Sequence, residues 1–308
     1  MYHRIIIPVE KGADAGSLSP LRPLARELGG ALTLLHVHHL QEAPAQLEGL
    51  PQYRFQHVVE RWDGLDQEAE LREEEWLRDL AMEIGRDEPG LEVSSRVVHA
   101  PLAHALAERH ERVLVVVPHE PDEEGPGRTV RELVRGGAAP VLLVRPEAST
   151  RPIRNILVPL DGSRFSLAIL EPVRELVRGS GAHVTLMEVV SGHGRFTRLL
   201  HPGDRSRAAA EAFLRRVGDE LVAELGPTVR TLLVEADDPA DAIVAQTRAG
   251  EFDLIAMATH GGGGIRRLLF GSTAEAVIRR SGVPVLVHHP AEIRVAAAPE
   301  TEPPLSAQ

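Results

Sequence analysis

The feature that most constrains the fold of this chain of 308 residues is that its sequence repeats once. Five short segments of the first half recur in the second half, in the same order and at similar spacing. The pairs are Ile5 to Glu10 with Ile156 to Asp161, Leu32 to His38 with Val184 to Val190, Val97 to Ala107 with Val234 to Ala245, Arg112 to His119 with Phe252 to His260, and Pro140 to Pro146 with Pro284 to Pro290. This pattern indicates a duplicated domain of about 140 residues.

Within each half, short apolar strands alternate with helical patterns, which favours parallel βα units. We therefore predict an α/β fold of two tandem doubly wound domains, each with a five-stranded, mostly parallel sheet. The first domain is expected over residues 1–148 and the second over residues 152–290, here called the first half and the second half. Residues 291–308 are rich in Pro and Ala and are predicted to be a disordered tail.

Composition and charge narrow the function. Residues 1–150 contain 16 Lys and Arg against 26 Asp and Glu, and residues 151–308 contain 18 against 19. Neither half is basic, so a nucleic-acid partner is not expected, and the near-neutral second half is the better host for an anionic ligand. No run of 18 apolar residues and no signal-peptide pattern is present, so we expect no membrane association and a cytoplasmic location.

The most informative stretch lies near the end of the second half. A buried strand is predicted from Leu254 to Ala258, followed by the glycines at 261–264. Gly271 and Ser272 then precede a helical segment that begins TAEAVIRR. Glycines allow a ligand to approach the backbone closely, and the start of a helix offers unpaired N–H groups to an anion. The stretch predicts a phosphate site, although it is neither a Walker A loop nor a G-x-G-x-x-G fingerprint.

The spacing Ala258-x2-Gly261-x9-Gly271-Ser272, followed by the residues PVLV, closely resembles the nucleotide motif of the universal stress protein family. That motif reads G-x2-G-x9-G-(S/T), and here Ala258 stands in place of its first glycine. The resemblance covers almost the whole chain as two tandem domains and implies a Rossmann-like fold of the adenine nucleotide alpha hydrolase type. Only the second half keeps the motif.

The resemblance further implies that the second half binds ATP or AMP, with or without Mg²⁺, in a stress-response regulator. Carried over to this sequence, the implied contacts lie at the ends of strands and around the glycine loop. They are Pro159, Asp161, Val189, Met257, Ala258, Gly261, Gly271, Ser272 and Thr273. Asp161 is expected to reach the ribose hydroxyls, but with Gly162 and Ser163 it could instead cap the following helix. No catalytic residue is expected, and any ATP hydrolysis should be slow because a P-loop lysine is absent.

The first half is predicted to have lost the site. Arg128 replaces Ser272, Glu10 replaces Asp161, and the loop EPDEEGP at 120–126 carries four carboxylates that would repel phosphates. Its role is then structural. The last strand of each half is predicted at a sheet edge, and in the family such strands pair between domains, so we expect an internal pseudo-dimer and consider a homodimer of two chains.

Three alternatives remain open at this point. The last in rank is an adenine-nucleotide hydrolase of related fold, such as a pyrophosphatase-loop enzyme, because such enzymes carry SGGxDS after the first strand, where this chain has Asp161-Gly162-Ser163. The chain could be a non-enzymatic interaction or dimerisation protein whose glycine loop is vestigial. His36 and His38 share one face of a strand, which is compatible with a metal ligand pair, but no further motif supports a metal site.

Overall fold

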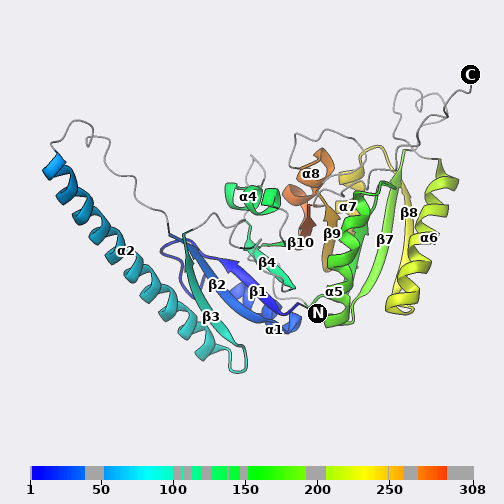
Figure 1. Cartoon of the computed structure of the whole chain (residues 1–308). Helices are drawn as coiled ribbons and strands as arrows, with labels where there is room; N and C mark the ends of the chain where they lie inside the picture. The colour runs from blue at the N-terminus through cyan, green and yellow to red at the C-terminus, as the bar shows by residue number, and fades with distance from the viewer. Residues whose placement is uncertain are drawn as a thin grey trace, which may run out of the picture.

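The computed structural model describes residues 2–38, 52–99, 106, 112–119, 126–136, 139–145, 152–191, 206–248, 250–259 and 270–289. Its centre is one ten-stranded sheet in the order β3-β2-β1-β4-β5-β10-β9-β6-β7-β8 (Figure 1). The strands of the first half are β1 (Arg4–Pro8), β2 (Ala31–Val37), β3 (Val93–Val98), β4 (Val113–Pro118) and β5 (Val141–Val144). Those of the second half are β6 (Asn155–Pro159), β7 (His183–Val190), β8 (Val229–Glu235), β9 (Leu254–Ala258) and β10 (Val285–His288).

Each half has the same strand order, in which the first strand lies between the second and the fourth. All neighbours within a half run parallel. The fold class predicted from the repeat is therefore confirmed. The predicted domain boundary near residue 150 lies outside the described residues and remains a prediction.

The two halves join through β5 and β10, which pair antiparallel with Leu286 opposite Leu142. The predicted pairing between the last strands of the two halves is therefore present within the chain. The junction covers one edge of each five-stranded unit, and β3 and β8 remain as the edge strands of the combined sheet.

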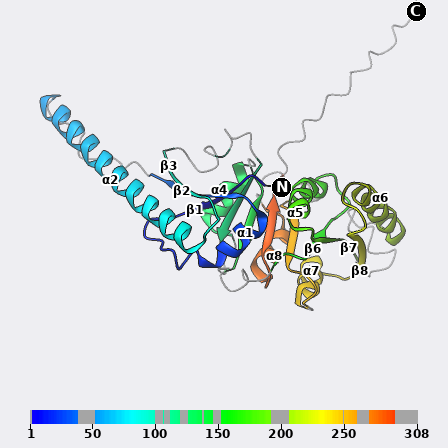
Figure 2. The same ribbon diagram turned by 90° about the horizontal axis from the view of Figure 1, so that it is seen from below.

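Helices cover both faces of the sheet, as Figure 2 shows from below. One face packs against α1 (Arg22–Leu28), α2 (Gln52–Asp87), α5 (Leu170–Ser180) and α6 (Arg207–Leu225). The other packs against α4 (Arg128–Gly136), α7 (Pro239–Arg248) and α8 (Ser272–Arg280). Along β1, Ile5 and Ile7 belong to the first core layer and Ile6 to the second, and all three are buried. A strand buried on both faces needs this continuous apolar run.

Local sequence signals set where the helices begin. Ser206 caps α6 by accepting a hydrogen bond from the N–H of Ala209 at 3.2 Å. Asp238 caps α7 by accepting from the N–H of Asp241 at 3.0 Å, with Pro239 in the first helical position. A short 3₁₀ turn, η3 (Ser166–Ile169), precedes α5, which places Pro172 in the first turn of the α-helix. A proline is tolerated there because the first N–H groups of a helix have no intrahelical partner.

Further contacts between the halves lie on the face that carries α1 and α5. Tyr2 donates its hydroxyl hydrogen to the carbonyl of Pro172 at 3.2 Å, and Glu27 accepts from the N–H of Ile153 at 2.9 Å. Arg112 forms an ion pair with the buried Glu175 at 2.8 Å. Together with β5 and β10, these contacts attach the halves to each other on two layers of the molecule.

Candidate functional site

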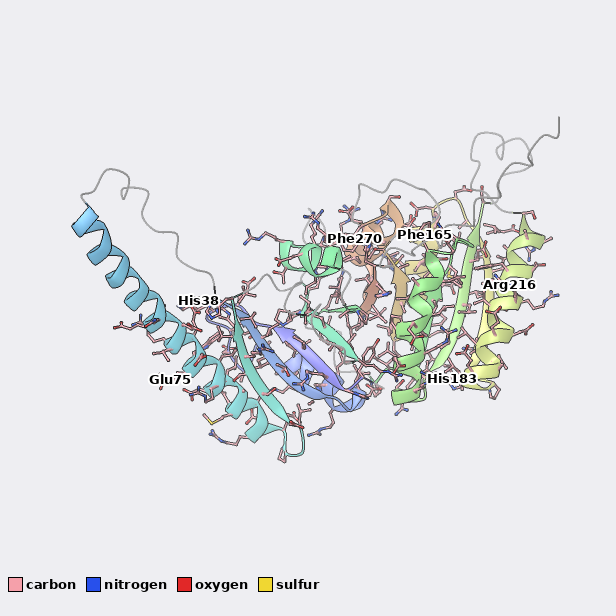
Figure 3. The ribbon with its side chains drawn as sticks, in the orientation of Figure 1. His38, Glu75, Phe165, His183, Arg216 and Phe270 are labelled. Atoms are coloured by element: carbon pink, nitrogen blue, oxygen red, sulfur yellow. The ribbon has the colours of Figure 1, made fainter. Side chains whose placement is uncertain are left out.

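Three strand ends meet where the order of the second half reverses. β6 pairs with β7 on one side and with β9 on the other, so their carboxyl ends lie next to one another. In doubly wound sheets this switch point is where ligands bind. In Figure 3, Phe165 and Phe270, from the segments that follow β6 and precede α8, lie at this end of the second half, and His183 at the start of β7 lies at the other.

An apolar surface is formed at this end by Pro159, Val189 and Met257. Residues two positions earlier in each strand (Leu157, Met187 and Ile255) belong to the core layer beneath α7 and α8. Because side chains alternate along a strand, Pro159, Val189 and Met257 lie on that same face. Met257 is buried, and Pro159 and Val189 are half-buried. These three side chains from neighbouring strands form an apolar patch, of which Pro159 and Val189 are the partly exposed members.

Asp161 lies two residues beyond the end of β6 and is exposed. Its Oδ1 accepts a hydrogen bond from the N–H of Ser163 at 3.0 Å, across Gly162, whose φ of 77° favours glycine. Ser163 in turn accepts from the N–H of Ser166 at 3.2 Å, at the start of η3. Asp161 therefore shapes the turn after β6, and Ser163 connects that turn to the start of η3, whose N-cap residue is Phe165.

Gly271 holds the start of α8 against the end of β9. Its N–H donates to the carbonyl of Thr259 at 2.7 Å, and a Cβ built on Gly271 would lie 3.4 Å from that same oxygen. Gly271 is the N-cap residue of α8 with extended backbone, and Ser272 and Thr273 follow in the first turn. Among the side chains that the structure describes, none caps this helix. Its first N–H groups are therefore arranged as donors for an anion.

Ala258 ends β9, opposite His288 in β10. Ala258 is buried, so the methyl group that replaces the motif's first glycine is accommodated at the strand end. Gly261 lies in 260–269, outside the described residues, as do His260, Arg266 and Arg267. The structure thus brings eight of the nine predicted contact residues to one end of the second half and says nothing of the ninth.

Sequence reasoning missed the part played by Thr259. Its side chain is completely buried and its Oγ1 lies 2.9 Å from Nδ1 of His289, while its carbonyl holds Gly271. Thr259 thereby links the ends of β9 and β10 to the start of α8. The sequence offered one indication of this role, namely that Thr259 lies between a predicted strand and the glycine loop.

The matching end of the first half is built differently. His36 Nδ1 donates to the carbonyl of Val9 at 2.7 Å, and His38 Nδ1 donates to the buried carboxylate of Glu73 at 2.7 Å. Lys11 Nζ lies 3.3 Å from the same carboxylate. Burial would raise the pKa of Glu73, but hydrogen bonds from His38 and Lys11 and the charges of both histidines outweigh it and lower the pKa. These residues fasten α2 to the ends of β1 and β2.

The metal alternative concerned the same histidines. Within the described part of the chain, no group of three or more His, Asp or Glu side chains has the geometry to hold a metal ion. Residues 120–125, the predicted acidic loop of the first half, lie outside the described residues. In the same described ranges, no helix is long and apolar enough to cross a membrane.

Comparisons with known proteins agree with this architecture. Residues 152–289 match the model of the universal stress protein family. The universal stress protein MJ0531 of Methanocaldococcus jannaschii is 32% identical over 141 residues, which is 44% of this chain and 81% of that protein. The chain therefore belongs to the universal stress protein family.

Solved structures extend the likeness to both halves. A universal stress protein from Archaeoglobus fulgidus is similar over 94% of this chain and 98% of its own, with a TM-score of 0.63 and 19% identity. This match covers the tandem fold. A universal stress protein in complex with cAMP is similar over 46% of this chain and 100% of its own, with a TM-score of 0.37 and 23% identity.

Proposed function

We propose that the second half of this protein binds an adenine nucleotide, ATP or AMP, and that the protein acts as a stress-response regulator. The observation that carries the proposal is the joint placement of the apolar patch of Pro159, Val189 and Met257 with the start of α8, which no described side chain caps. An adenine ring needs an apolar surface of this kind, and phosphates need converging N–H donors. Asp161 lies beside the patch at the end of the central strand β6.

In this arrangement the base would lie on the apolar patch, and the phosphates would be bound by the N–H groups of Ser272 and Thr273. The hydroxyls of these two residues add donors at the same place. The carboxylate of Asp161 would accept hydrogen bonds from ribose hydroxyls while its Oδ1 continues to support the turn. Gly261 completes the proposed set of contacts. Any Mg²⁺ would be held mainly by phosphate oxygens and water, as is usual for this ion.

The first half then has a structural role. The structure supports this through Glu73, His38 and Lys11, which fasten α2 to its strand ends, and through β5, which pairs with β10. At the start of α4, Arg128 follows Gly127 where Ser272 follows Gly271. We propose one nucleotide per chain, bound by the second half.

The alternative is an interaction protein with a vestigial loop. In that alternative dimerisation is the function, but the last strands of the two halves, β5 and β10, are paired with each other within the chain. The pairing favours a rigid scaffold for a ligand site over an edge that recruits a partner.

The test is to purify the protein, release bound ligand by heat and identify it by HPLC and mass spectrometry. The emptied protein is then titrated with ATP and AMP by calorimetry. Co-purified adenine nucleotide, or stoichiometric binding near one per chain, supports the proposal. Failure to bind either nucleotide at millimolar concentration contradicts it and leaves the interaction protein as the better account.

A further inference from the structure

Arg131 and Glu275 occupy the same position in the two halves. Each lies four residues after an equivalent glycine, Gly127 or Gly271, that precedes a helix. The backbone repeats as well, because the N–H of Arg131 donates to the carbonyl of Gly127 at 3.0 Å and the N–H of Glu275 donates to that of Gly271 at 3.0 Å. The two positions are thus structurally matched but carry opposite charges.

The junction of the halves brings these two residues together. β5 and β10 pair symmetrically about Leu142 and Leu286, so helices α4 and α8 lie next to each other on one face of the sheet (Figure 1). Arg131 Nη2 lies 3.7 Å from Glu275 Oε1, with the two side chains 44% and 41% exposed. Two identical charged residues at this position would repel each other, whereas this chain has a complementary pair.

Glu275 has opposing effects on the proposed site. It lies in the first turn of α8, where a negative charge interacts favourably with the helix dipole. Glu275 shares the first turn of α8 with Ser272 and Thr273, so its charge would also repel a phosphate bound there. The first half supplies a positive charge next to Glu275 through Arg131. The Nε of Arg131 donates to the carbonyl of Pro126 at 2.7 Å, which positions the guanidinium group.

The length of the ion pair is informative. A separation of 3.7 Å is longer than a direct charge-assisted hydrogen bond, which is about 2.7–2.9 Å. The guanidinium therefore neutralises Glu275 at short range without a tight bidentate contact.

We propose that Arg131 of the first half sets the phosphate preference of the nucleotide site in the second half, favouring nucleoside triphosphates over monophosphates. The inference rests on the proposed function. It assigns to the first half, which lacks the motif, a specificity-determining residue. The contribution of Arg131 to the binding free energy should be larger for ATP than for AMP. The triphosphate of ATP carries more negative charge than the monophosphate of AMP and reaches further from the ribose.

The experiment is a set of calorimetric titrations with ATP and with AMP. The variants are Arg131→Gln, Glu275→Gln, their double mutant, and Arg135→Gln as a matched control on the same helix, where Arg135 is exposed. Arg131→Gln should weaken ATP binding about two- to fivefold, the range expected for a partly exposed ion pair, and weaken AMP binding less. Glu275→Gln should strengthen ATP binding, and Arg135→Gln should leave both affinities within about twofold.

The double mutant separates two modes of action. If Arg131 acts only through its ion pair with Glu275, its loss has no effect in the Glu275→Gln background; if its own charge also acts on the phosphates, part or all of the effect remains. Either result supports the proposal. An unchanged ratio of ATP to AMP affinity in Arg131→Gln overturns it while leaving nucleotide binding intact. If the parent binds neither nucleotide, the proposed function itself fails, and this inference fails with it.

Discussion

Leu142 and Leu286 lie directly opposite each other in the antiparallel pair of β5 and β10, and both are completely buried. Each follows an equivalent proline, Pro140 or Pro284, by two residues, so the two leucines mark the centre of a pseudo-two-fold junction. The strands that would be exposed edges in each half are thereby covered by each other. Exposed edges favour uncontrolled pairing, so the junction both joins the halves and protects them.

This junction should contribute strongly to stability. Replacing Leu142 by Ala is expected to lower the free energy of unfolding by about 2–5 kcal/mol, since it leaves a cavity in a packed core. Leu286→Ala should cost a similar amount. Val222→Ala on α6, where Val222 is 40% exposed, is a control and should stay within about 0.5 kcal/mol. Urea denaturation of the full chain measures all three, and a loss below 1 kcal/mol at both leucines would show that the junction is not a stabilising element.

Asp161 should be separable into a structural and a binding role. Asp161→Asn keeps an oxygen that can accept from the N–H of Ser163, so the thermal midpoint should change little. Removal of the negative charge should weaken ATP binding about tenfold, since hydrogen bonds to charged groups are the stronger ones. Asp161→Ala should lose both. If the parent and Asp161→Asn bind ATP with equal affinity, Asp161 has no role in binding and only stabilises the turn after β6.

His288 should make stability depend on pH. Burial lowers the pKa of His288 below its ordinary value of 6.5, with a smaller effect from His289. The unfolded chain therefore takes up the proton at a higher pH than the folded protein. The free energy of unfolding should fall as the pH drops below 6.5 and stop falling at the folded-state pKa.

The matched variant for this prediction is His288→Val, because Val144 occupies the equivalent place at the end of β5. Chemical denaturation between pH 8 and pH 5, a range that brackets the imidazole titration, should show a flatter pH dependence in this variant than in the parent. His183→Val, at an exposed histidine, should keep the parent's slope. If the free energy of unfolding of His288→Val depends on pH as strongly as that of the parent, His288 is not the cause of the pH dependence.

Sequence patterns predicted best the helices and strands whose own residues carry a strong pattern, such as a continuous apolar run or a proline. The strand at Leu254–Ala258 was predicted with its observed bounds, because a fully apolar run between turn residues has few alternatives. The helical pattern from Arg164 to Arg178 contains Pro172, which predicts either a kink or a later helix start, and in the structure α5 begins at Leu170. The spacing of Ala69, Trp76, Leu80 and Ile84 predicts a helix from Asp66 to Ile84, but the helix in the structure spans Gln52–Asp87. A single glycine, Gly64, costs about 1 kcal/mol in a helix and does not end it.

The rest of the site depended on relationships between segments far apart in the sequence. No local pattern shows that Thr259 supports Gly271 through its carbonyl, because that contact forms only when α8 packs against β9. The meeting of Arg131 with Glu275 likewise depends on the register of β5 and β10 across 144 positions of sequence, the spacing between these equivalent residues. The repeat predicted that the halves correspond, but only the packed structure shows which equivalent residues touch.

The central claim is that one nucleotide binds at the start of α8 and none at the equivalent place in the first half. Calorimetric titration of ATP into the parent, Gly271→Asp and Gly127→Asp tests it most directly. Neither glycine has a positive φ, and a Cβ at either position meets no atom closer than 3.4 Å, so both variants should fold. The account predicts that Gly271→Asp weakens ATP binding at least about tenfold by placing a carboxylate beside the phosphates, while Gly127→Asp binds like the parent. Parent-like binding by Gly271→Asp, or equal weakening in Gly127→Asp, would contradict it.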